Sequence, residues 1–166
     1  MDLQQLQSQH DALDVTADEF LQLIADNATP RQLGTLRWQF ARQLMSHLAL
    51  EDQFFYPAMQ RQAHVRLRET AARLQVEMEP LALSFSHYMS RWSDDRIARE
   101  WPDFCRESRQ IIEMMINRMR KEEELLMPLI TQAGLEPLRV LERVDYSLCV
   151  LVIDDDAVWL GRVRCP

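Results

Sequence analysis

The sequence has little of what a β-rich, nucleic-acid-binding or membrane-spanning protein needs. Only three of its 166 residues are glycine, and Leu, Ala, Gln, Glu and Arg, which favour helices, are abundant. The formal net charge of −7 argues against a nucleic-acid partner, because a phosphate backbone requires a basic face. No apolar run approaches the ~20 residues of a transmembrane helix. We therefore expect an all-α protein with no nucleic-acid partner and no membrane partner.

Cysteine and targeting patterns are also sparse. Cys105, Cys149 and Cys165 make an odd number, and none of them forms a CxxC pair. This pattern is typical of reduced thiols. The opening residues, MDLQQLQSQHDALD, lack the basic and apolar regions of a signal peptide. Both features predict a cytoplasmic location.

Four segments carry apolar residues at alternating spacings of three and four, the periodicity of a helix with one buried face. They cover residues 3–24, 33–58, 67–92 and 102–129, and a polar link around residues 93–95 joins the last two. Short links between helices imply antiparallel neighbours. The sequence therefore predicts an antiparallel up-down-up-down four-helix bundle over residues 1–133.

Residues 134–166 do not continue this pattern and are predicted to form a short non-bundle C-terminal tail. Within it, residues 149–153 read CVLVI and have the character of a short strand, followed by the run Asp154, Asp155 and Asp156. We expect this tail to pack on the bundle or to be partly loose.

Two of the helical segments contain similar stretches. Residues 47–57 read HLALEDQFFYP and residues 118–128 read RMRKEEELLMP, so each has a glutamate followed by an acid and, later, a proline at the same spacing. The apolar stripe passes through Phe54 in the first stretch and Leu125 in the second. Two helical hairpins of similar design would produce this repeat.

Five ionisable residues occupy positions on the buried stripes: His10, His47, Glu51, Arg118 and Glu122. An uncompensated buried charge costs several kcal/mol, so these side chains must pair with one another or bind a ligand. Counting ~1.5 Å per residue along antiparallel helices brings them to one level of the bundle. The i, i+4 spacing of His47 and Glu51 suits ligation of a single metal ion. A metal site and a hydrogen-bonded polar core both satisfy the pattern.

This arrangement resembles the hemerythrin family, specifically the bacterial domains with repeated His-His-Glu patterns, over about residues 1–133. The resemblance implies that the metal ligands are His10 of the first helix, His47 and Glu51 of the second, and Glu122 of the fourth. In the family, the histidines of the first two helices serve one iron and the two carboxylates bridge to a second iron.

The chain departs from the family at the ligands of that second iron. Met78 and Arg118 stand where the third and fourth helices should offer histidines. The resemblance therefore implies a single metal ion, with iron the first candidate. Met78 marks a lost ligand position, and Arg118 acts as a substitute cation or as an ion-pair partner for Glu51 and Glu122.

Several nearby polar residues have simpler interpretations. His64 and His87 lie off the stripes and are expected at the surface. In the acidic run 122–124, Glu122 alone is predicted to point inward. Glu77 and Glu79 flank Met78, and one of them could turn inward as a replacement ligand.

Two classes of function follow. The first is a non-enzymatic hemerythrin-like protein that binds one metal ion and senses oxygen, iron or redox state through it. Oxygen carriage by the family's chemistry uses two irons, each giving one electron, so we do not expect an oxygen carrier. The second is a metal-free bundle without a cofactor. It would serve as a regulatory or interaction module for an unknown protein partner, with a relic metal site. An oxidase-type enzyme is the least favoured interpretation.

Overall fold

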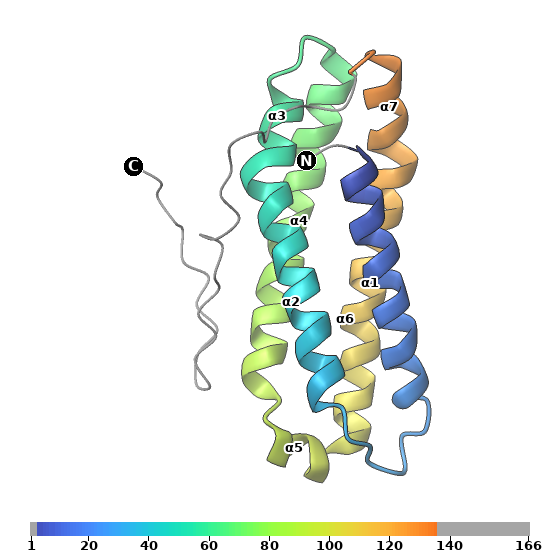
Figure 1. The fold of residues 1–166 in the computed structure, drawn as a ribbon. Coiled ribbons are helices and arrows are strands. Elements are labelled where there is room, and N and C mark those ends of the chain that lie inside the picture. The colour runs from blue at the N-terminus through green and yellow to red at the C-terminus, as the bar shows by residue number, and fades with distance from the viewer. Residues whose placement is uncertain (1–2, 136–166) are drawn as a thin grey trace.

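The computed structural model describes residues 3–135, apart from the side chains of Met78 and Glu79, and it is all-α, with no strand among these residues. The long helices are α1 (Leu3–Leu23), α2 (Gly34–Leu50), α4 (Val65–Arg91) and α6 (Trp101–Lys121). Figure 1 shows them side by side, with successive helices running in opposite directions. The predicted strand and acidic run of the tail, with Cys149 and Cys165, lie outside the described residues.

The half of the molecule nearer the α2 N-terminus has an aromatic core. Phe104 of α6 packs on Phe20 of α1, Tyr88 of α4, and Trp92 and Trp101, with ring centroids 5.5–6.2 Å apart. Burying a side chain of this size contributes ~1.5–3 kcal/mol. Phe40 of α2 packs on Phe20 and Phe85, so the aromatic core ties the four long helices together. The five polar stripe residues lie in the other half.

Two wide turns interrupt the second and fourth predicted helices. A π-helical segment, η1 (Glu51–Phe55), separates α2 from α3 (Tyr56–Gln60), and η2 (Glu122–Leu126) separates α6 from α7 (Met127–Gln132). Each segment begins at a glutamate of the repeated stretch and ends two residues before its proline. Proline lacks the N–H that would continue the regular ladder, and its ring crowds the preceding turn, which favours a wider turn here.

Within the two π turns, the residue that faces the core lies one position later in the chain than predicted. The shift is confined to the turns, because the predicted core residues beyond them, Ala58 and Leu129, are buried. Phe55 is buried and Phe54 only half-buried, and Leu126 is buried while Leu125 is 42% exposed. The prediction of Phe54 and Leu125 as core residues was wrong, because the wider π turn changes which of its residues faces the core.

The link around residues 93–95 is also more ordered than expected. A short helix, α5 (Asp94–Arg99), begins there, and the Ser93 side chain accepts a hydrogen bond from the Arg96 N–H (3.4 Å) at its N-terminus. Asp94 and Asp95 lie in the first turn, where the helix dipole favours negative charge. No helix of the described chain is both long and apolar enough to cross a membrane.

Candidate metal site

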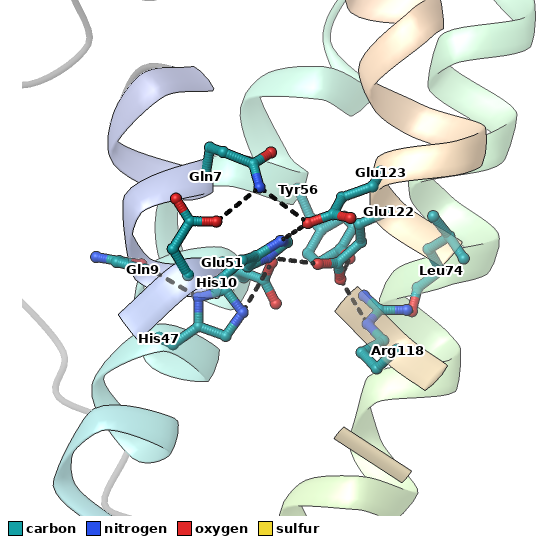
Figure 2. Close-up of polar contacts among 11 residues, drawn as sticks. Gln7, Gln9, His10, His47, Glu51, Tyr56, Leu74, Arg118, Glu122 and Glu123 are labelled. Atoms are coloured by element: carbon teal, nitrogen blue, oxygen red, sulfur yellow. Dashed lines mark hydrogen bonds and ion pairs between the residues drawn. The ribbon is translucent and has the colours of Figure 1, made fainter. Parts of the chain in front are cut away.

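The structure brings four of the polar stripe residues together inside the bundle. His10 of α1, His47 of α2, Glu51 at the start of η1 and Glu122 at the start of η2 each offer one ligand atom, and these atoms all lie within 4.8 Å of one another. All four side chains are at most 2% exposed. The two imidazole rings meet edge to face, with centroids 4.9 Å apart. Figure 2 shows the four side chains pointing toward one another from separate elements.

The atoms at the centre of this group lack hydrogen-bond partners within the described chain. They are Nε2 of His10 and of His47, both carboxylate oxygens of Glu51, and Oε2 of Glu122. His10 Nε2 approaches Glu122 Oε2 to 3.3 Å and His47 Nε2 approaches Glu51 Oε1 to 3.5 Å, without hydrogen-bond geometry. Buried polar atoms are almost always satisfied. Two imidazole nitrogens and two carboxylates that converge without partners fit a divalent metal ion.

Outer hydrogen bonds hold both histidines with Nε2 facing the centre. His47 Nδ1 lies 3.1 Å from Gln9 Oε1, and His10 Nδ1 lies 2.8 Å from Glu123 Oε1. An amide oxygen and a carboxylate oxygen only accept, so each Nδ1 carries the proton of the bond. In a neutral ring this leaves the lone pair on Nε2, the state a metal ligand needs.

Arg118 and Tyr56 close the side of the site toward α4. Arg118 Nε lies 2.6 Å from Glu122 Oε1 in a short ion pair, although without aligned hydrogen-bond geometry, and its Nη1 donates to the Leu74 carbonyl (2.5 Å). The Tyr56 hydroxyl donates to the same Glu122 oxygen (2.5 Å), and the guanidinium lies 5.0 Å from the Tyr56 ring centroid. Glu122 therefore has one oxygen engaged and leaves Oε2 for a metal ion.

The structure refines the interpretation of Arg118. Its ion pair joins it to Glu122, and it acts on Glu51 through its charge alone. A cation already in contact with Glu122 disfavours a second metal ion on this side, because two neighbouring positive charges in a buried site repel each other. The four described donors thus converge on a position that could hold one metal ion. The Met78 side chain lies outside the described residues.

Burial and neighbouring charges shift the pKa values of the four candidate ligands in different directions. Burial raises the pKa of Glu51 well above its usual value, and the Glu122 carboxylate adds to that rise. Burial alone would also raise the pKa of Glu122, but His10 and Arg118 outweigh it and the pKa is lowered. Burial lowers the pKa of His47 to about 4. Burial lowers the pKa of His10 too, yet Glu122 and Glu123 reverse the effect and the pKa is raised.

These shifts describe a balanced metal-free site. When His10 and Glu51 are protonated, cationic His10 and Arg118 face anionic Glu122 and Glu123, and Glu51 can donate its proton toward Glu122. A divalent ion that displaces the protons of His10 and Glu51 leaves the total buried charge unchanged. The site can therefore release two protons and bind one divalent metal ion without leaving a buried charge uncompensated.

Comparison with known proteins agrees with this geometry. The model of the hemerythrin HHE cation-binding domain family matches residues 1–130. The chain belongs to this family. Neither the curated proteins nor the solved structures gave a match. The structure brings the four candidate ligands together, and Arg118 lies beside them.

The other residues weighed as ligands lie elsewhere. His87 is exposed, and the His64 ring accepts a hydrogen bond from the Leu67 N–H at the start of α4. Glu77 pairs with Lys121 at 2.5 Å, away from the cluster. The Glu79 side chain lies outside the described residues.

Sequence reasoning missed the partners that orient the histidines. Glu123 was expected to face solvent but holds His10, and neither Gln9 nor Tyr56 was assigned a role. Gln9 and Glu123 each adjoin a candidate ligand in the sequence. That adjacency is a signal that could have drawn attention to them.

Proposed function

We propose that this HHE domain binds a single metal ion, with iron the first candidate, through His10, His47, Glu51 and Glu122. The observation that carries the proposal is the convergence of buried nitrogen and oxygen atoms that make no well-aligned hydrogen bond within the described chain. Gln9 and Glu123 orient the two imidazoles toward the ion. When bound, iron would supply a one-electron redox change inside a water-poor interior.

Metal content and one pair of histidine variants test this proposal. Protein loaded anaerobically with Fe²⁺ should hold at most about one ion per chain by elemental analysis. His47→Ala should abolish binding because it removes a ligand nitrogen, whereas His87→Ala, at an exposed position, should leave it intact. Two tightly bound irons, or equal losses from both variants, would contradict the single-metal site.

A metal-free regulatory or interaction module is the second candidate, and one observation favours it. The ion pairs of His10 and Arg118 with Glu122, and the proton on Glu51, balance the buried charges without an ion. Such a network can also serve to specify one packing of the helices. Wild-type protein whose melting temperature does not respond to Fe²⁺, Zn²⁺ or Mn²⁺ would favour this role.

The wider role we propose is sensing of oxygen, iron or redox state rather than catalysis. It rests on the enclosure of the site and on its single metal position, which does not suit two-iron oxygen carriage. The arrangement in Figure 1 supports the up-down-up-down four-helix topology for this domain. We also propose a cytoplasmic location, with which the free, buried thiol of Cys105 is compatible.

A further inference from the structure

The candidate ligands are enclosed by protein, so an ion needs a path to them. Among the described residues, the polar side chains that contact the four ligands include Gln9, Tyr56, Arg118 and Glu123. Tyr56 and Arg118 are buried. Glu123 is 37% exposed and is the charged member of this group that reaches solvent. It joins the surface directly to His10 through a 2.8 Å contact.

Further acidic side chains lie on the surface of α1 beside Glu123. The Gln7 amide donates to Glu123 Oε1 (Figure 2) and also to Asp11 Oδ1, each at 3.2 Å, and therefore holds these two carboxylates close together. Asp14 is exposed and interacts electrostatically with Glu123, His10 and Asp11. A cation at this seam between α1 and η2 meets negative charge first.

The seam between α4 and α6 differs, because its surface charges are paired and a buried cation lies beneath them. Arg118 lies there, bound to the α4 carbonyl of Leu74, and Lys121 of α6 pairs with Glu77 of α4. A divalent cation approaching from that side meets a guanidinium before it meets a ligand. The charge distribution therefore gives the site an attractive side and a repulsive side.

We propose that metal ions enter the buried site at the seam between α1 and η2, where Glu123 acts as the transfer ligand that passes the ion to His10 and Glu122. The inference rests on the proposed metal-binding function. It adds to that function the direction of loading and a residue that captures the ion before the four inner ligands do. Asp11 and Asp14 raise the local concentration of cations in front of Glu123.

The internal repeat supplies a matched control. Asp52 follows Glu51 as Glu123 follows Glu122, and it is an exposed carboxylate next to a candidate ligand. Asp52, however, accepts a hydrogen bond from Gln75 of α4 (2.7 Å) rather than from a histidine. Glu123→Gln and Asp52→Asn therefore remove the same charge at equivalent positions. In Glu123→Gln, the amide oxygen of the new side chain can still accept from His10 Nδ1.

In the test, metal-free protein is mixed with Co²⁺ in a stopped-flow instrument, and the visible absorption of bound Co²⁺ reports the association rate. Calorimetry measures the equilibrium affinity. Glu123→Gln should slow association about tenfold at low ionic strength, and the difference should shrink at ~0.5 M salt because the charge is screened. Asp52→Asn should change the rate by less than about twofold. Asp14→Asn should slow association with little change in affinity, because Asp14 makes no hydrogen bond to a ligand residue.

The outcomes separate this inference from the function on which it rests. If wild-type protein binds no Co²⁺ at equilibrium, the metal-binding function itself is wrong. If it binds Co²⁺ and Glu123→Gln associates as fast as wild type, or Asp52→Asn slows equally, the entry route is overturned while metal binding stands. A weaker affinity with an unchanged association rate would reduce Glu123 to a residue that orients His10.

Discussion

Arg118→Met is the substitution for which the structure gives the clearest consequence. The guanidinium is 5% exposed, lies 2.6 Å from Glu122 and donates to the Leu74 carbonyl. Methionine preserves apolar volume but removes the positive charge beside the Glu122 carboxylate and the donor to the Leu74 carbonyl. Removing one partner of a buried ion pair costs ~3–5 kcal/mol. Because His10 remains 3.3 Å from Glu122, we expect the lower end, about 3 kcal/mol in the free energy of unfolding.

For a domain of this size, such a loss corresponds to a melting temperature lower by about 10 °C. Metal should recover much of it, since an ion that binds only the folded state at 100 times its dissociation constant adds about 2.7 kcal/mol. The assay is a thermal melt of metal-free protein, with and without Zn²⁺ or Fe²⁺. Arg120→Met is the matched control, because Arg120 is exposed and donates to Asn117 on its own helix.

Two results would refute this reasoning in different ways. A melting temperature for Arg118→Met equal to that of Arg120→Met would mean that the guanidinium makes no net contribution inside the bundle. A large loss that metal does not recover, in a variant that stays folded, would mean that the cluster is a metal-free polar core. The second result would favour the interaction module.

Three further predictions concern packing, protons and ligand orientation. In urea titrations, Leu126→Ala should lower the free energy of unfolding by ~2–5 kcal/mol and Leu125→Ala by less than ~1 kcal/mol. The difference is expected because Leu126 is buried and Leu125 is 42% exposed. Equal losses would contradict the π turn. Metal-free protein should lose stability as pH rises above 6.5, the ordinary pKa of His10, because the raised pKa values of His10 and Glu51 favour the protonated folded state. Metal affinity should rise over the same pH range, because the protons of His10 and Glu51 leave. A metal-induced change in melting temperature that is independent of pH would count against the exchange of these protons for a metal ion. Gln9→Leu removes the acceptor that orients His47 and should weaken Zn²⁺ binding about 10–100-fold by calorimetry, whereas unchanged affinity would show that His47 needs no such support.

The sequence by itself determined the fold class and the members of the polar cluster. Apolar residues at spacings of three and four specify helices wherever the pattern is long. A charged residue on such a stripe is conspicuous, because burying it without a partner is costly. His10, His47, Glu51, Arg118 and Glu122 could therefore be singled out, and counting along antiparallel helices placed them at one level.

Only the tertiary structure decided which residues face the core within the two π turns and which partners surround the histidines. A π turn adds one residue to a helix without leaving a gap in its apolar pattern, so Leu125 and Leu126 are equally plausible core residues until the helix is packed. Gln9 and Glu123 reach His47 and His10 across helix boundaries, and the angles of those contacts depend on how the helices lie against one another. Periodicity shows which face of a helix is buried, whereas contacts between helices determine what each buried atom meets.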